Sequence, residues 1–293
     1  MKMNITIFVK DELDVNGPFQ LTNETTIINT DTLVSIFDPA SLAALSLAKE
    51  ILDFSKHTVT ALTVGPKSSE RILRTSLAIG ATKAIRIWDD AFDREKPSAV
   101  VTAKLLAEAA KYSDLILCGY KSLSGDAGFV GPSVAATLNI PQICGVSWFD
   151  ISEDHAKITA HRKLKYGDRE VNTVTTPAVL TVDDDAAETP YPSLPAVIDA
   201  ECADIEVLNL EQLGFSNKDA KDKVSGQFEK YTPPKPRAKQ TAGAGSPDMS
   251  GADLMSMLAG ASSGKSDSSL LEGDPEKIAK EVVSFLKEKE LIV

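Results

Sequence analysis

Apolar runs alternate with helical patterns along the chain up to residue 140. Four short apolar runs predict buried strands, at Met3–Val9, Thr58–Val64, Ala84–Ile87 and Leu115–Cys118. One-sided helical patterns lie between them, at Ser41–Phe54, Ser69–Ile79 and Ala99–Tyr112. Gly80 follows the second pattern and is a typical helix stop. This alternation predicts an α/β fold, with a Rossmann-like parallel sheet flanked by helices.

The pattern changes at Ile143, where short apolar runs are separated by polar turns. The predicted strands are Ile143–Ile151, Ala156–Leu164, Arg169–Thr175 and Ala178–Val182. We expect all four to be antiparallel strands added at the edge of the same sheet.

A proline-rich segment, Asp183–Pro195, follows these strands. It contains Pro190, Pro192 and Pro195, so it cannot pair in the middle of a sheet and is expected to form a stiff surface loop. Leu194 would be exposed at the tip of this loop. On the residues alone an ordinary connector is the simpler interpretation, and a docking loop with an apolar anchor is the alternative.

Glycine, alanine and serine dominate residues 241–269, which predicts a flexible linker. A short apolar cluster lies inside it, at Leu254, Met255, Met257 and Leu258. Beyond it, Asp274 is a good N-cap and Pro275 suits the first helical position. One apolar stripe follows, made of Ile278, Val282, Phe285 and Leu286. The expected domains are therefore an α/β domain over 1–213, a linker or insert over 214–273 and a C-terminal arm over 274–293 that docks on a partner.

Composition narrows the classes of function. The formal net charge of −11 disfavours nucleic acid and anionic membrane as partners. The three cysteines lie far apart, which excludes zinc ribbon and iron–sulfur motifs, and Cys118 is expected to be buried. The three histidines are too scattered for a metal centre, and we expect His155 and His161 to be solvated. With neither a signal-peptide pattern nor an apolar segment of membrane-spanning length, the chain is expected to be soluble and cytoplasmic.

The most distinctive segment follows the run Leu115–Cys118. Its glycines are Gly119, Gly125, Gly128 and Gly131. A helical pattern resumes at Val134, so the segment predicts a buried strand, a glycine-rich turn and a helix. Such a turn lets backbone N–H groups approach an anion closely, and we expect that anion to be a nucleotide phosphate. The alternative is that the glycines only shape a tight connection.

The segment matches neither of the two standard phosphate-binding motifs. There is no Gly-x-Gly-x-x-Gly pattern, and Asp126 follows Gly125 where a P-loop needs lysine. We expect Asp126 to be a carboxylate at the helix start that orients the turn or a ribose, so that Asp126→Ala would lower nucleotide retention. The strand ends at Phe8–Lys10, Val64–Pro66 and Gly119 would meet at one edge of a parallel sheet, which favours a nucleotide site there.

These segments, in this order, resemble the beta subunits of electron-transfer flavoproteins. The matching stretches are Ser35–Pro39, Thr63–Pro66, Thr75–Ala81, Leu115–Pro132, Leu138–Gln142, Pro192–Ala196 and Leu271–Pro275 with the helix after it. The resemblance covers about 1–213 and 270–293, and the glycine-rich stretch is its most specific part. Residues 214–269 are longer and looser than the family pattern.

The resemblance implies one half of a heterodimeric electron carrier rather than an enzyme. Its partners would be an alpha subunit, with which it shares FAD, and flavin dehydrogenases of the acyl-CoA type. The beta subunit would also hold AMP or, in electron-bifurcating members that oxidise NADH, a second FAD. A subunit of that bifurcating kind and a stand-alone adenine-nucleotide-binding module of the stress-protein type are the alternatives. No catalytic or metal-binding residue, no nucleic acid partner and no stable membrane insertion are expected.

On matching positions the resemblance also names residues. The expected nucleotide-binding residues are Phe8, Asp38, Pro39, Ala40, Ser41, Val64, Gly119, Ser122, Leu123, Ser124, Gly125, Asp126, Ala127, Gly128, Phe129 and Val130. Leu194 would plug into an apolar pocket of a dehydrogenase. The chain departs from the family pattern at Asp38, Ser124 and Phe129, where the family has Asn, often Asp, and Gln. It also lacks the usual arginine before Tyr191.

Overall fold

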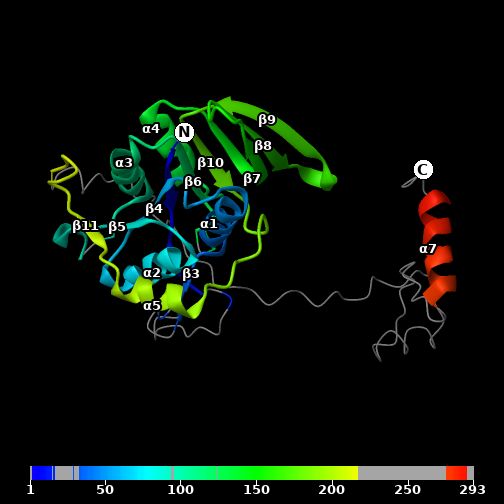
Figure 1. The fold of residues 1–293 in the computed structure, drawn as a ribbon, viewed down its shortest axis with the longest axis horizontal. Coiled ribbons are helices and arrows are strands. Elements are labelled where there is room, and N and C mark those ends of the chain that lie inside the picture. The colour runs from blue at the N-terminus through cyan, green and yellow to red at the C-terminus, as the bar shows by residue number, and fades with distance from the viewer. Residues whose placement is uncertain are drawn as a thin grey trace, which may run out of the picture. The chain divides into compact units, whose positions relative to one another are not determined.

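The structure is a computed structural model that describes residues 2–14, 16, 29, 33–93, 96–123, 125–216 and 275–288. The chain divides into two compact units, Met1–Thr232 and Pro233–Val293, and each is described by itself. The first unit contains a sheet and the helices that cover it (Figure 1). The second contributes one helix to the described residues.

Among the described residues of the first unit, nine strands form one sheet in the order β11–β5–β4–β1–β6–β10–β7–β8–β9. The strands are β1 (Asn4–Phe8), β4 (Thr58–Val64), β5 (Lys83–Ile87), β6 (Leu115–Gly119), β7 (Gln142–Ile151), β8 (Lys157–Lys163), β9 (Arg169–Thr175), β10 (Ala178–Val182) and β11 (Glu206–Leu208). All neighbours from β11 to β7 pair in parallel, whereas β7, β8 and β9 pair antiparallel. The expected α/β fold with a largely parallel sheet is confirmed.

Helices cover both faces of this sheet. They are α1 (Pro39–Ile51), α2 (Glu70–Ile79), α3 (Ala99–Ala110) and α4 (Val130–Leu138). A buried apolar cluster lies on each face. Helices α1 and α2 pack in the first cluster, and α3 and α4 pack in the second. Side chains of β6 alternate between them, with Leu115 and Leu117 in the first cluster and Ile116 and Cys118 in the second. The sheet is therefore a buried layer, as the apolar runs predict.

The strand order places a switch point beside β1. The chain goes from β1 to β4 and β5 on one side and then returns to β6 on the other side of β1. At such a point the connections leave the sheet in opposite directions, and a crevice forms at the carboxyl ends of the strands. The ends of β1, β4 and β6 thus form the place to look for a ligand site.

One strand prediction is wrong. Ala178–Val182 is not an antiparallel edge strand, because β10 lies inside the sheet and pairs in parallel with both β6 and β7. Every residue of β10 is buried. A continuous apolar run of this kind is typical of an internal parallel strand covered on both faces. The strand order, which is set by long-range pairing, decides this position.

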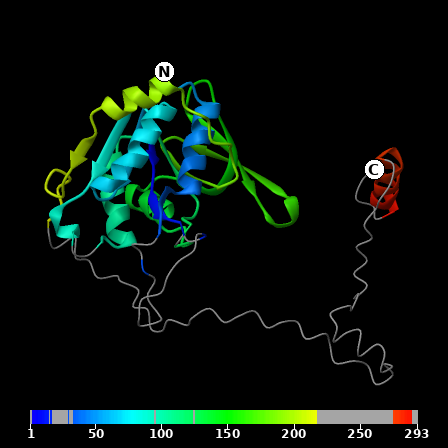
Figure 2. The same cartoon turned by 90° about the horizontal axis from the view of Figure 1, so that it is seen from below.

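The other late strands agree better with expectation. β7 pairs in parallel with β10 over its first residues and antiparallel with β8 over the rest, with a register shift after Val146. The antiparallel pairing of β8 and β9 is confirmed, and Figure 2 shows this green ribbon extending beyond the helices of the unit. The apolar pattern did not predict β11 or a separate antiparallel pair, β2 (Asp11–Leu13) with β3 (Ser35–Phe37).

The three early helices occur where predicted, with shifted ends. Gly80 ends α2 with φ of 128°, a conformation that favours glycine, so its role as a stop is confirmed. α4 begins at Val130 rather than Val134. The helix-start position expected for Asp126 is therefore wrong. This residue precedes the helix and has φ of 45°.

Within the proline-rich segment, residues 188–193 belong to no helix or strand, and a short helix then begins. Helix α5 (Leu194–Cys202) starts at the residue expected at a loop tip. The loop-tip position is wrong, but the exposure is confirmed, since 72% of Leu194 is exposed. Ser193 caps the helix, and Pro195 suits its first turn.

His155 was expected to be solvated, but it is half-buried. Its ring lies edge-on to His57, with the ring centres 5.5 Å apart, and its Nδ1 is buried with no hydrogen-bond partner among the described residues. His57 is buried and accepts a hydrogen bond from the Met3 N–H at 3.2 Å. Burial, together with repulsion from His155, lowers the pKa of His57.

The described part of the second unit is the helix α7 (Pro275–Glu288), which confirms the predicted C-terminal helix. Of its stripe, Ile278 and Leu286 are half-buried, whereas Val282 and Phe285 are exposed. The predicted N-cap Asp274, the linker 241–269 and its apolar cluster lie outside the described residues. The docking role of this arm stays a prediction. No helix among the described residues has the length and apolar character needed to cross a membrane.

Candidate functional site

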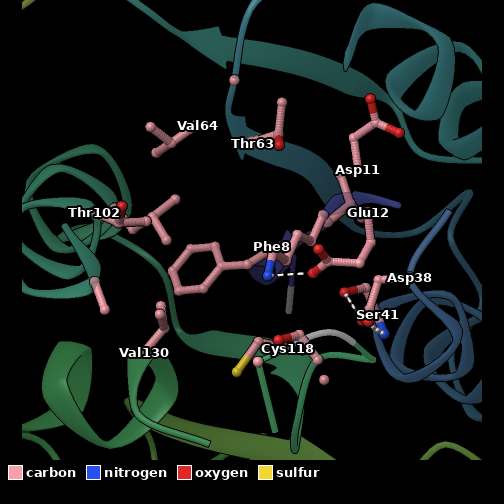
Figure 3. A pocket seen from close by; sticks show the side chains of 18 of the residues that line it. Phe8, Asp11, Glu12, Asp38, Ser41, Thr63, Val64, Thr102, Cys118 and Val130 are labelled. Carbon is pink, nitrogen blue, oxygen red and sulfur yellow. Dashed lines mark hydrogen bonds and ion pairs between the residues drawn. The ribbon is translucent and has the colours of Figure 1, made fainter. Parts of the chain in front are cut away.

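A cavity of about 470 Å³ lies at the carboxyl ends of β1, β4 and β6 (Figure 3). It coincides with the switch point of the sheet. Residues that follow each of the three strands line it, and α3 and the first residues of α4 supply the remaining wall. The volume falls within the range of about 300–1,000 Å³ that is typical of small-molecule sites.

The cavity has an apolar side and a polar side. The Phe8 ring reaches into it, and Val64, Thr102 and Val130 lie around the ring in Figure 3. On the opposite side, towards α1, the same view shows Asp11, Glu12, Asp38 and Ser41. A ligand with a planar ring at one end and polar groups at the other would match this division.

Asp38 holds the polar side together. Its carboxylate is 1% exposed and caps α1, where one oxygen accepts hydrogen bonds from the Ser41 N–H at 2.9 Å and the Ser41 hydroxyl at 2.7 Å. The other oxygen accepts from the Leu123 N–H at 3.0 Å. One buried side chain thus ties the start of α1 to the glycine-rich turn.

Gly119 allows the strand to approach α1 closely. A Cβ atom at this position would lie 2.8 Å from the backbone carbon of Ala40 and from the Ser41 nitrogen. These backbone atoms cannot move without displacing the helix that Asp38 caps. The first glycine of the turn is therefore required by packing, in addition to any approach to a ligand.

The start of α4 forms part of the cavity wall. Phe129 stands at the N-cap position, and its apolar side chain cannot satisfy the first N–H groups of the helix. Phe129, Val130 and Gly131 all line the cavity. The helix start therefore presents backbone donors and the positive end of a dipole at the cavity wall.

Charged residues gather at the mouth of the cavity. Lys10, Lys96 and Lys121 are the lysines that line it. Lys10 pairs with Glu12, and Lys121 lies 3.2 Å from Asp126. The mouth thus offers cations for an anionic group and carboxylates for hydroxyl groups.

A second network lies beside these residues and is centred on Asp11. Asp11 accepts a hydrogen bond at 2.8 Å from Arg71 and is bonded by Ser35 and Ser69 at 2.5 and 3.4 Å. The buried Arg86 guanidinium donates to Glu70 at 3.1 Å. These contacts join β2, β3, β5 and the start of α2 around the cavity.

Cys118 lines the cavity but does not supply a reactive thiolate. Its side chain is buried as expected, and burial raises the pKa of the thiol to about 12. The thiol therefore remains protonated at neutral pH. Cys118 therefore supplies no thiolate nucleophile to the cavity.

The structure brings most of the expected nucleotide-binding residues to this cavity. Those that line it are Phe8, Asp38, Ser41, Val64, Gly119, Ser122, Gly125, Ala127, Gly128, Phe129 and Val130. Pro39, Ala40, Leu123 and Asp126 instead line an adjacent hollow of about 340 Å³, which shares Asp38, Tyr120, Lys121 and Ser122 with the cavity. Ser124 lies outside the described residues.

Sequence reasoning missed a further set of lining residues. Among them are Asp11, Glu12, Trp88, Lys96 and Thr102. Asp11 and Glu12 lie just beyond the strand end at Phe8–Lys10. That position in the sequence could have identified them as residues near the site. Trp88 also follows a predicted strand, whereas Lys96 and Thr102 reach the cavity only because α3 packs over it.

Comparisons with known proteins agree on one family. The model of the electron transfer flavoprotein domain matches residues 25–213. A curated protein named electron transfer flavoprotein subunit beta, from Bacillus subtilis, is 29% identical over 293 residues, with 99% of this chain and 100% of that protein covered. The subunit of the same name from Thermoanaerobacterium thermosaccharolyticum is 31% identical over 214 residues, covering 72% of this chain and 80% of the relative.

A third relative is named after a specific reductase. It is the acryloyl-CoA reductase electron transfer subunit gamma of Anaerotignum propionicum. It is 28% identical over 242 residues, which cover 79% of this chain and 89% of that protein. The similarity to the Bacillus subtilis protein, which covers 99% of this chain, includes the cavity, the proline-rich segment and α5.

Proposed function

The chain belongs to the electron transfer flavoprotein family, and on that premise we propose that it is the beta subunit of a heterodimeric carrier that relays electrons from flavin dehydrogenases to a downstream acceptor. The observation that carries the proposal is the cavity at the switch point. It lies where the family match and the glycine-rich turn coincide, and it has the polarity of an adenylate site.

The residues of the cavity fit an adenine nucleotide. Phe8, Val64 and Val130 offer apolar surface to the base. The uncapped start of α4 and Lys121 suit a phosphate, and the carboxylates of Asp11 and Glu12 suit the ribose hydroxyls. The shared chemistry is that of an adenylate, which AMP and FAD both contain.

FAD shared with an alpha subunit would supply the redox chemistry. The part played by this chain is then to bind, orient and exclude water. Asp38 holds the turn against α1, and the buried thiol of Cys118 keeps its proton. No covalent step is assigned to any residue of the cavity, consistent with a carrier.

Cofactor counting tests the proposal. The chain co-produced with its alpha partner should purify as a heterodimer, and acid release of the small molecules followed by chromatography should give one FAD and one AMP per heterodimer. Two FAD molecules with rapid bleaching by NADH would instead assign the bifurcating function. A monomeric chain that is colourless and ignores the alpha partner would contradict the proposal.

Leu194 is proposed as an apolar anchor for the dehydrogenase, on the basis of its match to the docking loop and its exposure. Replacing Leu194 by alanine should raise the KM for a reduced acyl-CoA dehydrogenase about tenfold, because a buried interface anchor contributes roughly that much to affinity. Stopped-flow measurement of flavin reduction in the heterodimer reports the change, and the flavin spectrum should not alter.

The matched control is Tyr112→Ala, which removes an exposed aromatic side chain just after α3. That change should leave the KM as it is. Equal kinetics for Leu194→Ala and the unsubstituted protein would contradict the docking role.

A further inference from the structure

Helix α5 carries an exposed apolar stripe and is held to the domain by few apolar contacts. Leu194, Val197 and Ile198 lie on one face of the helix and are 72, 37 and 55% exposed. Of the nine residues of α5, only Ala200 is buried. Apolar burial alone therefore does little to fix the direction in which this stripe points.

The carboxyl end of α5 is bonded by a side chain from another helix. The last turn of α5 contains no basic residue, and the final carbonyl groups of a helix lack partners within it. Arg74, on α2, donates from one guanidinium nitrogen to the carbonyl oxygens of Ala200 at 2.8 Å and Glu201 at 2.7 Å. The same nitrogen lies 3.3 Å from the carbonyl oxygen of Ala203.

Arg74 is itself well anchored. Its neighbours Ile72 and Leu73 are fully buried between α2 and the sheet. The guanidinium also suits its position electrically, because a cation at the carboxyl end of a helix interacts favourably with the helix dipole. Helix α2, through Arg74, thus holds the carboxyl end of α5, a surface helix with few buried residues.

The other end of α5 is held less firmly. The Ser193 hydroxyl accepts from the Ala196 N–H at 3.4 Å, and residues 188–192 before it belong to no helix or strand. The ion pair between Arg74 and the Glu201 carboxylate is long, at 3.7 Å, and that carboxylate is 65% exposed. The bonds from Arg74 to the backbone are therefore the strongest polar attachment of α5 among the described residues.

We propose that Arg74 is a positioning residue for electron transfer: by capping α5 it holds Leu194, Val197 and Ile198 as one fixed apolar surface for the dehydrogenase. This inference rests on the docking role proposed for Leu194. It adds that the surface is a helical stripe rather than one side chain, and that its orientation is set from α2. A preordered surface binds more tightly because less conformational freedom is lost on association.

Hydrogen exchange and kinetics on the heterodimer test the inference together. Arg74→Ala should speed amide exchange in residues 194–203 about ten- to a hundredfold, the range expected for losing hydrogen bonds from a charged donor. It should raise the KM for a reduced acyl-CoA dehydrogenase about tenfold at unchanged kcat. Arg74→Lys keeps the charge and part of the bonding, so it should restore much of both properties.

Glu201→Gln is the matched control. It removes the long ion pair but keeps the bonds from Arg74 to the backbone, so exchange in α5 and the KM should both stay as they are. FAD and AMP content should be unchanged in all three variants, because α5 does not line the cavity.

Two results would overturn the inference. Unchanged exchange in α5 after Arg74→Ala would show that other contacts hold the helix. Faster exchange at unchanged KM, in a protein where Leu194→Ala does raise the KM, would show that orientation does not matter for docking. If Leu194→Ala is silent as well, the inference falls with the docking role, and the exchange data still show whether Arg74 holds α5.

Discussion

Replacing Asp38 by alanine should lower the free energy of unfolding by about 2–4 kcal/mol, since a lost helix cap costs about 0.5–2 kcal/mol and a buried donor left without a partner about 1–3 kcal/mol. Alanine leaves the N–H groups of Ser41 and Leu123 without their acceptor. The glycine-rich turn also loses its tie to α1, so the nucleotide content should fall well below one per heterodimer. Urea unfolding and analysis of the released nucleotide measure the two effects.

Two comparisons sharpen this prediction. Asp38→Asn keeps one carbonyl oxygen and should be intermediate, because one of the two groups of hydrogen bonds can still form. Asp154→Ala removes an exposed carboxylate that likewise accepts from a hydroxyl and an N–H group, at 2.6 and 3.0 Å. That control should retain its nucleotide and lose little stability. A fully loaded and stable Asp38→Ala protein would show that Asp38 does not organise the site.

Gly119→Ala should cost about 1–3 kcal/mol of stability, the usual range for inserting a methyl group into a filled core, with the effect at the upper end. The added carbon would meet backbone atoms of Ala40 and Ser41 at 2.8 Å, and a backbone yields less readily than the end of a side chain. Because α1 and the turn meet here, nucleotide retention should fall as well. Thermal unfolding and nucleotide content report the outcome.

Gly125→Ala is the control within the same turn. A Cβ there would meet the Ser122 hydroxyl at 3.2 Å, which can rotate away. This variant should keep nearly the full stability of the unsubstituted protein. Equal stability of the Gly119 and Gly125 variants would contradict the close approach of β6 to α1.

Asp38 shows how a departure from the family pattern can be accommodated. An acidic residue beside a phosphate site is unfavourable by its charge alone. In this chain both carboxylate oxygens accept hydrogen bonds from the protein, at α1 and at the turn. The carboxylate of Asp38 thus stabilises the wall of the cavity through its hydrogen bonds. The start of α4 and the lysines that line the cavity are the groups suited to an anion.

The sequence by itself determined the early alternation of strands and helices and the sheet edge at which the cavity lies. Apolar runs that alternate with one-sided helical patterns are enough to predict a parallel sheet covered on both faces. The spacing of apolar residues along an element indicates whether one side or both sides of it are buried. The glycine-rich turn after β6 likewise located the cavity, since only small residues allow a strand, a turn and a helix start to meet closely.

Only the tertiary structure decided which elements are neighbours. β10 lies inside the sheet instead of at its edge. Asp126 does not line the cavity, whereas Trp88, Lys96 and Thr102 do. Arg74 reached the end of α5 across more than a hundred residues of chain. Local patterns encode how far a residue is buried, but strand order and helix packing follow from the free energy of the whole chain, so contacts distant in sequence emerge only in the fold.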